Sequence, residues 1–178
     1  MEEARVIALV RAGETDAFAE IIGHYQAPII RYLYRMTGDY EMAKDLAQDT
    51  FIQAYKGILK TDAELSFRAW LYRIATNNAL QNRRRKKLLS FILFTAKEHD
   101  MPDSKNQADC TGESLALHEA LLKVPEEQRT CLVLHFVVGF KYREIAETLG
   151  CSEEAVRKRV ARGKKLFISL YNREGGGV

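Results

Sequence analysis

The sequence predicts an all-α protein in which two small helical domains are joined by a flexible linker, and three observations favour this class. Apolar residues recur every three or four positions along most of the chain, which is the helical period, while the alternation typical of strands is nearly absent. A polar stretch at residues 95–113 separates two helical blocks. The second block contains glycine and serine at the spacing of a helix-turn-helix. The length of 178 residues suits two small domains or one of medium size.

The first block begins with two expected helices. One covers residues 2–12 and ends at a glycine. Thr15 or Asp16 can cap the next, because their side-chain oxygens accept hydrogen bonds from free backbone N–H groups. Pro28 is expected to break or kink that helix, because proline lacks the backbone N–H and crowds the preceding turn. A turn is expected at residues 38–39.

Two more helices are expected after this turn. The first covers residues 40–59, with an apolar stripe of Ala43, Ala47, Phe51, Ala54 and Ile58. A short polar segment follows at residues 60–66. The second helix starts at Phe67 and continues into five adjacent cations at residues 83–87. We therefore expect a first domain over residues 1–94.

The apolar stretch at residues 88–94 admits three interpretations. We favour a continuation of the preceding helix that packs locally. In the second interpretation it docks the two domains together in the free protein and hides their DNA-binding surfaces, because apolar patches of this size usually mark an interaction site. The third is a membrane-surface anchor, in which cations precede an apolar segment.

Residues 95–113 are predicted to be a linker. They include five acids and several small polar residues, so they cannot bury enough apolar surface to offset the entropy of ordering. A second helical domain is expected over residues 114–178, with breaks at Val124-Pro125, Gly139 and Gly150.

The most specific local pattern lies at residues 142–156. Ala146 is small enough for two helices to approach closely, and Gly150 can adopt the positive φ of the turn between them. Ser152 is a good N-cap for the second helix of the pair. The buried stripe of that helix is predicted at Val156, Val160, Gly163 and Phe167. The pattern is typical of a helix-turn-helix.

The opposite face of this second helix is mainly cationic. It carries Glu154, Arg157, Lys158, Ala161, Arg162 and Lys165. A recognition helix needs such a face, because it must neutralise phosphates and reach base edges in the major groove. A helical hairpin with a solvated basic face would produce the same pattern, and Glu154 is unfavourable beside phosphates. We favour DNA binding.

The helix after residue 66 has a second nucleic-acid pattern. Residues 66–89 contain seven basic side chains and no acidic one. Aromatic and basic side chains alternate at Phe67, Arg68, Trp70, Tyr72 and Arg73. Aromatic rings can stack on unpaired bases while cations follow the backbone. Trp70 suits the core equally well. The run at residues 83–87 favours nucleic acid, because adjacent like charges repel unless an anion joins them.

An acidic face is predicted on the helix at residues 40–59. Its members are Asp45, Gln48, Asp49 and Ile52, which share one side by their spacing and lie away from the apolar stripe. Acidic faces are usually only solvated. This one would suit a basic protein partner.

Several other classes are disfavoured. Cys110, Cys131 and Cys151 form no CxxC pair, and the four histidines share no ligand spacing, so we expect no disulfide framework and no metal. We find no glycine-rich phosphate loop and no nucleophile elbow, and therefore expect neither a cofactor nor an enzyme. No apolar run reaches the length of about 18 residues that a membrane span needs. Because the N-terminus lacks a signal-peptide apolar stretch, a cytoplasmic protein without membrane insertion is expected.

With both halves in view, the sequence resembles bacterial sigma factors of the extracytoplasmic-function (ECF) class, over nearly the whole chain and in the right order. Residues 39–55 are similar to the family helix that docks on the clamp coiled coil of RNA polymerase. Residues 67–77 resemble the helix that engages the minus-10 promoter element. Residues 124–129, followed by the helix-turn-helix, resemble the domain that binds the minus-35 element and the polymerase flap.

The resemblance implies roles for particular positions. Contact with polymerase would involve Asp45, Gln48, Asp49 and Ile52. The minus-10 element would be met by Phe67, Arg68, Trp70, Arg73, Asn77, Arg83, Arg84 and Arg85, beside a loop at residues 60–66 that receives a flipped base. The minus-35 groove would be met by Arg157, Lys158, Ala161, Arg162 and Lys165.

Three positions depart from the family pattern. Glu154 and Ala155 stand where the family often has a small residue and a threonine, which removes a hydroxyl that could hold phosphate and leaves the minus-35 preference open. Gln81 stands where an aspartate is common, so that helix is less acidic.

The resemblance therefore implies a sigma factor with core RNA polymerase and promoter DNA as partners. It also points to an anti-sigma factor, although no single residue demonstrates one. The alternative is a self-sufficient helix-turn-helix regulator whose N-terminal domain senses a ligand or protein. That alternative predicts tight, specific duplex binding without polymerase.

Overall fold

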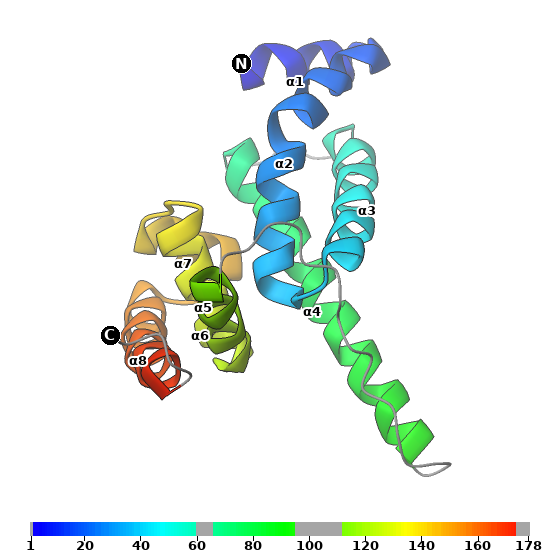
Figure 1. Ribbon diagram of the computed structural model, residues 1–178. Coiled ribbons are helices and arrows are strands. Elements are labelled where there is room, and N and C mark those ends of the chain that lie inside the picture. The colour runs from blue at the N-terminus through cyan, green and yellow to red at the C-terminus, as the bar shows by residue number, and fades with distance from the viewer. Residues whose placement is uncertain (1, 60–65, 95–111, 174–178) are drawn as a thin grey trace.

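The computed structural model describes residues 2–59, 66–94 and 112–173, and within these ranges the chain forms helices and no strand (Figure 1). For residues 90–94 and 112–114 the description covers the helical backbone only. The predicted all-helical class is confirmed. The predicted linker at residues 95–113 lies almost wholly outside the described residues. No helix in the described ranges is long and apolar enough to cross a bilayer.

The first two helices are α1 (Glu3–Arg11) and α2 (Phe18–Thr37), with a short 3-10 turn (Thr15–Ala17) between them. The expected cap by Thr15 or Asp16 was wrong: the turn intervenes, and no side chain caps the start of α2. Of the two outcomes expected at Pro28, the break does not occur, since α2 continues through this residue, and the kink stays a prediction. The proline leaves the carbonyl of His24 without its helical donor, and His24 lies on the exposed side of the helix.

Helices α3 (Tyr40–Ile58) and α4 (Phe67–Phe94) complete the first group. Gly38 ends α2 with a left-handed φ of 79°, and Asp39 then caps α3 by accepting a hydrogen bond from the Met42 N–H at 3.0 Å. The predicted apolar stripe of α3 is buried. A polar chain joins α3 to α4, because Asn78 donates to the Thr50 hydroxyl and accepts from Gln53, both at 3.1 Å.

The favoured interpretation of the apolar stretch at residues 88–94 is confirmed in one respect, because α4 continues to Phe94 as a single helix. The local packing expected for this stretch does not occur at its first two residues, Leu88 and Leu89. Leu88 and Leu89 are 60% and 56% exposed, so neither docks the two halves of the chain together.

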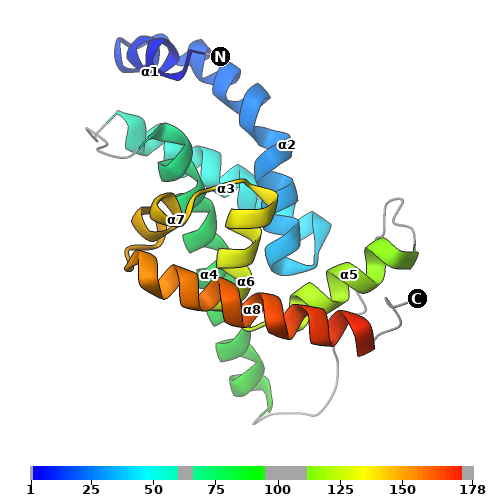
Figure 2. The same ribbon diagram turned by 90° about the vertical axis from the view of Figure 1, so that its left-hand side faces the viewer.

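The second group comprises α5 (Gly112–Lys123), α6 (Glu126–Leu132), a π-helical turn (Val133–Val137), α7 (Tyr142–Leu149) and α8 (Glu153–Arg173). The predicted breaks all fall between elements. Gly139 and Gly150 take the positive φ values that favour glycine, 82° and 65°. In Figures 1 and 2, α8 lies on the outside of this group, on the side of the molecule opposite α3.

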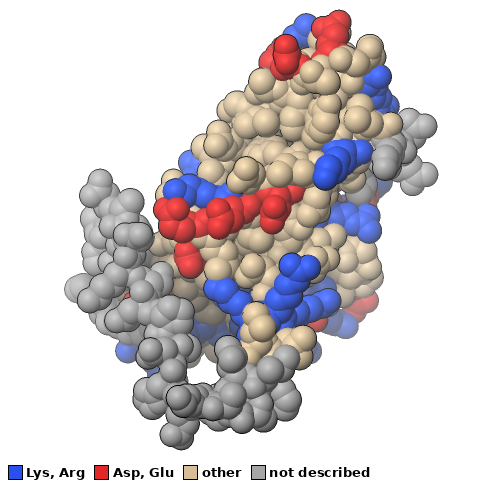
Figure 3. All heavy atoms as spheres, turned by 90° about the vertical axis from the view of Figure 1, so that its right-hand side faces the viewer, with Lys and Arg blue, Asp and Glu red and all other residues tan. Residues whose placement is uncertain are grey.

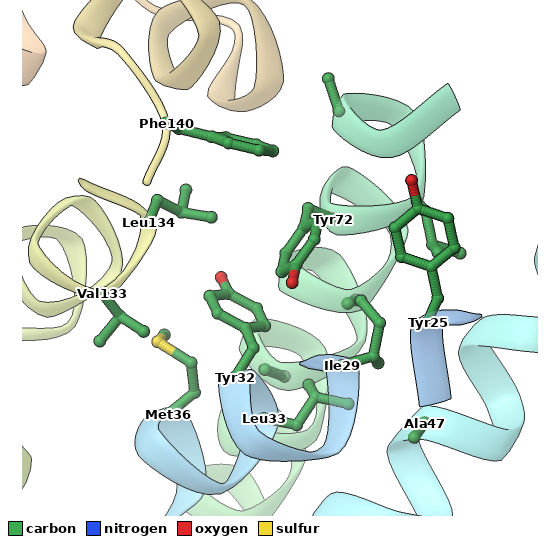
Figure 4. Packing of buried hydrophobic residues seen from close by; sticks show 14 of the residues in the cluster. Tyr25, Ile29, Tyr32, Leu33, Met36, Ala47, Tyr72, Val133, Leu134 and Phe140 are labelled. Atoms are coloured by element: carbon green, nitrogen blue, oxygen red, sulfur yellow. The ribbon is translucent and has the colours of Figure 1, made fainter. Parts of the chain in front are cut away.

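The two groups share one continuous hydrophobic core (Figure 4). Met36 of α2 faces Val133, and Tyr72 of α4 packs edge to face against Phe140 with the ring centroids 5.3 Å apart. Tyr32 is fully buried beside them and bonds its hydroxyl to that of Thr76 at 2.7 Å. The chain is therefore packed in a closed arrangement, in which α2 and α4 contact the second group directly.

Candidate nucleic-acid and protein interfaces

The helix-turn-helix is formed as predicted by α7, the turn at residues 150–152 and α8. The Ser152 hydroxyl accepts a hydrogen bond from the Ala155 N–H at 3.2 Å, which satisfies one of the free donors at the start of α8. At the turn, the Cys151 N–H donates to the Ala146 carbonyl at 3.0 Å, closing the end of α7. The predicted stripe of α8 faces inward: Val156, Val160 and Gly163 are buried and Phe167 is half-buried.

The outer face of α8 presents the predicted cations to solvent. Its exposed members are Arg157, Lys158, Ala161, Arg162 and Lys165. Two of them are paired along the helix: Lys158 with Glu154 at 2.7 Å, and Arg157 with Glu153 at 3.4 Å. Exposed pairs of this kind are weak, so phosphates can displace the carboxylates. Glu154 thus orients a cation in the absence of DNA.

Arg159 is a structural residue that the sequence patterns did not single out. It is half-buried between α8 and α6, where its guanidinium pairs with Glu127 at 2.8 Å and donates to the Cys151 sulfur at 3.5 Å. Its position three residues after Val156 and one before Val160 places it at the edge of the buried stripe, which is the only sequence signal for this role. The contact fixes α8 against the rest of the helix-turn-helix.

On α4 the predicted promoter residues fall into two environments. Arg73, Asn77, Arg84 and Arg85 are exposed and available to a ligand. Phe67 is 6% exposed and packs against Tyr25 and Trp70, so in this arrangement its ring serves the core, and its contact with DNA stays a prediction. Trp70 is partly buried against Gly57 of α3. Its ring therefore packs on the core and also keeps an exposed part, so its contact with DNA stays a prediction.

Two of the predicted promoter residues contact the second group of helices instead of solvent. The Arg68 guanidinium lies 4.7 Å from the centre of the Phe140 ring and donates a hydrogen bond to the Val138 carbonyl. Arg83 lies with its Nε 3.9 Å from the carboxylate of Glu126 on α6. The closed arrangement therefore occupies part of the surface that the sequence assigns to the promoter.

The acidic face of α3 is exposed as predicted. Asp45, Gln48 and Asp49 are all open to solvent, and Ile52 beside them is 45% exposed. Figure 3 shows acidic side chains gathered across the face of the molecule that carries α3, with basic side chains lower on the same face. The predicted base-capturing loop lies outside the described residues except for Ser66.

The structure contains an apolar groove of about 360 Å³ that the sequence patterns did not predict. It lies between α5, the π-helical turn and α8, and its walls include Leu117, Leu121, Phe136, Val137, Phe167 and Ile168. Phe136 and Val137 are 60% and 54% exposed. A periodic pattern predicts burial for such residues, and only the packing of three elements shows that they line an open groove.

The fold and these surfaces define a helical transcription factor with a DNA-reading helix-turn-helix in its second half. Comparison with known proteins agrees in both halves. Residues 21–88 match the family model for sigma-70 region 2, and residues 114–167 match that for sigma-70 region 4.

Two relatives match over about nine tenths of their own length. The chain is 32% identical over 170 residues to the ECF RNA polymerase sigma factor SigW of Bacillus subtilis, covering 89% of this chain and 91% of that one. It is 30% identical over 175 residues to the RNA polymerase sigma-H factor of Pseudomonas aeruginosa, covering 92% and 91%. The fold is also that of the sigma factor RpoE of Bartonella quintana, solved in complex with the anti-sigma factor NepR, with a TM-score of 0.72 at 19% identity over 87% of this chain and 96% of that one.

The chain belongs to the ECF sigma factors of bacterial RNA polymerase. As a member of this family it binds core RNA polymerase and promoter DNA and directs promoter-specific initiation of transcription. The family consists of initiation factors and not of enzymes.

Proposed function

We propose that the three surfaces divide the work of promoter recognition. The acidic face of α3 contacts core polymerase, the exposed cations of α4 meet the minus-10 element, and the outer face of α8 reads the minus-35 groove. This division corresponds to a first domain at residues 1–94, a linker at 95–113 and a second domain at 114–178. One observation carries the proposal: the cationic face of α8 is exposed, and the capped turn of the helix-turn-helix holds this helix in place.

The minus-35 assignment is supported by the geometry of α8. Arg157, Lys158, Ala161 and Arg162 lie on one exposed side of a helix whose other side is buried in the domain. A helix held in this way can enter a major groove while its side chains reach base edges and phosphates. Ala161 is small, so base edges on the floor of the groove can approach the helix between the longer cationic side chains.

The minus-10 assignment is supported by the exposed residues of α4. Arg73, Asn77, Arg84 and Arg85 remain open in the closed arrangement, while Arg68 and Arg83 are engaged by the second group. We infer that promoter binding requires the two groups to separate, because the second group covers part of Arg68 and Arg83, which the promoter would otherwise contact.

A protein partner is proposed for the apolar groove between α5 and α8. RpoE of Bartonella quintana was solved with an anti-sigma factor, and we propose such a partner for this chain as well. The groove offers it an apolar surface that is exposed in the free chain. We further propose that the protein acts in the cytoplasm, where its polymerase is, and that it has no catalytic activity of its own.

Run-off transcription from a genomic fragment library tests the function as a whole. With core polymerase and this protein, new start sites should share two upstream elements and vanish when the protein is left out. Tight, specific duplex binding by the protein alone, with no new start sites, would favour the self-sufficient regulator.

Two substitutions test the division of labour. Arg162→Ala should reduce transcription by about tenfold at promoters with a preferred minus-35 sequence and much less at others, because a base contact is lost. Arg84→Ala should weaken binding to all promoters similarly and reduce the dependence of affinity on salt by about one phosphate contact. Identical behaviour of the two variants across a panel of promoter sequences would contradict the assignment.

A further inference from the structure

A half-open pocket of about 230 Å³ lies where the two groups of helices meet. Its walls come from α2, α3 and α4 on one side and from α5 and α6 on the other. Three cations line it, namely Arg83 and Lys86 of α4 and Arg129 of α6. Glu126 is the one acidic side chain among its described walls. The pocket thus holds an excess of positive charge at a junction between domains.

Arg129 is buried to an extent that is unusual for an arginine. Its residue is 3% exposed, and its Nη1 donates to the Leu122 carbonyl at 2.7 Å. Its Nε has no hydrogen-bond partner among the described residues. A buried donor without a partner is costly, and more so when the group is charged. The fold therefore maintains a buried guanidinium with one unsatisfied N–H group in a residue that lines the pocket.

Arg83 faces the same pocket from the opposite group. Its Nη1 is also buried without a partner in the described part of the chain. Its only described acidic neighbour is Glu126, at 3.9 Å from Nε, which is too long for a hydrogen bond. Arginines from α4 and α6, each with one buried unsatisfied N–H group, thus belong to the walls of one pocket on its two sides.

The electrostatics of the pocket are unfavourable as they stand. Burial lowers the pKa of Arg129 to about 10, and the positive charge of Arg83 contributes in the same direction, against a smaller opposite effect of Glu126. One carboxylate against three cations leaves a net charge of two uncompensated. An anion with several acceptor oxygens would neutralise this charge and accept hydrogen bonds from the cationic side chains that line the pocket.

We propose that this pocket binds a phosphate-type anion, either inorganic or carried by a nucleotide, which bridges Arg83 and Lys86 of α4 to Arg129 of α6. Guanidinium groups suit such a ligand, because their planar N–H donors match the oxygens of phosphate. The ligand contacts both groups of helices, so it stabilises the closed arrangement over an open one. Ligand binding would then oppose release of the promoter-binding surfaces. The site shares Arg83 with the promoter assignment made above, so this consequence for promoter binding rests on the proposed function, whereas binding of the anion itself does not.

Calorimetric titration of the full-length protein with inorganic pyrophosphate, in phosphate-free buffer at physiological ionic strength, tests the proposal. The wild type should show saturable binding to one site. Arg83→Gln should weaken the affinity by about tenfold or more, because a charged hydrogen bond is lost. Arg84→Gln is the matched control: it removes the same charge from the next position of the same basic run, outside the pocket, and should keep the wild-type affinity within about twofold.

A second pocket variant and a second ligand complete the experiment. Lys86→Gln, at an exposed position of α4, provides a second pocket variant if Arg83→Gln is poorly folded. ADP that binds more tightly than pyrophosphate would identify a nucleotide site, while equal affinity would identify the diphosphate alone. X-ray scattering should show that pyrophosphate keeps the wild type compact. Absence of saturable binding, or equal losses in Arg83→Gln and Arg84→Gln, would overturn the proposal.

Discussion

At the scale of single residues, His118 shows how the closed arrangement constrains a titratable group. This residue of α5 is 6% exposed, and its ring stacks on Tyr34 of α2 with the centroids 4.4 Å apart and the planes at 12°. Both ring nitrogens lack a hydrogen-bond partner among the described residues. Burial lowers the pKa of His118 to about 4, and the nearby Arg35 and Arg129 add to the effect. The imidazole is therefore neutral in the folded protein at pH 7.

This pKa predicts that the protein loses stability when the pH is lowered through a defined window. Between pH 6.5 and about 4 the unfolded chain binds a proton at His118 that the folded chain does not, so the free energy of unfolding decreases as the pH falls through this window. The loss attributable to this residue is at most about 3 kcal/mol. His118→Phe keeps the stacking and removes the titration. Urea unfolding across the window should show a flatter pH dependence for the variant.

The comparison is between variant and wild type, because carboxylates titrate in the same range. His24→Gln, at an exposed site of α2, serves as the control and should retain the wild-type slope. Parallel pH profiles for His118→Phe and the wild type would contradict the assignment.

Gly57 provides a second prediction at this scale. A Cβ added there would lie 2.7 Å from Cζ2 of Trp70, which is too close for the indole to stay in place. Gly57→Ala should therefore destabilise the protein by about 1–2 kcal/mol, after the gain in helix propensity is taken into account. Denaturant unfolding, followed by the fluorescence of the chain's one tryptophan, measures the effect.

Gly23→Ala is the matched control for this substitution. No atom lies within 4 Å of the added Cβ, and the position is inside α2. This variant should stabilise the protein by up to about 1 kcal/mol through helix propensity alone. A loss of stability at Gly23 equal to that at Gly57 would show that the Trp70 contact is not the cause.

At the scale of the element, the start of α8 depends on one hydroxyl. Ser152→Ala removes the acceptor for the Ala155 N–H and should lower the free energy of unfolding by about 1 kcal/mol. Affinity for minus-35 duplexes in the presence of polymerase should fall as well, because the first turn of the recognition helix frays. Ser169→Ala, at an exposed site within the same helix, should leave both quantities nearly unchanged. Equal effects at both serines would exclude a capping role.

At the scale of the whole molecule, a contact between α4 and the segment just before α7 helps to hold the two groups together. Arg68→Ala removes the hydrogen bond to the Val138 carbonyl and the cation–π contact with Phe140. We expect the population of the open form to rise by about tenfold or more, because a charged hydrogen bond across the junction is lost. Small-angle X-ray scattering should detect this change as a larger radius of gyration.

Arg73→Ala is the control for this experiment, since Arg73 is exposed on the same helix and carries the same charge. Its scattering profile should match the wild type. If Arg68→Ala gives that profile too, the closed arrangement is maintained by the apolar contacts of Tyr72 and Phe140 without help from this arginine.

Local chemistry allowed much of this protein to be predicted from its sequence. Helical periodicity identified the stripes of α3 and α8, because a buried face repeats every three or four residues whatever lies against it. Gly150 and Ser152 marked the helix-turn-helix, because a left-handed turn and an N-cap are properties of single residues. Exposure of the cations on α8 and the acids on α3 followed from these same periods.

Only the tertiary structure decided which residues meet across the two halves of the chain. Arg68 and Arg83 look like their neighbours in the basic helix, yet Arg68 contacts the segment before α7 and Arg83 contacts α6, while Arg73, Arg84 and Arg85 face solvent. Arg129 and His118 became buried, unsatisfied groups because elements distant in the chain close over them. Periodicity specifies which side of a helix is buried. It does not specify what covers that side, because the partner depends on how all the helices pack at once.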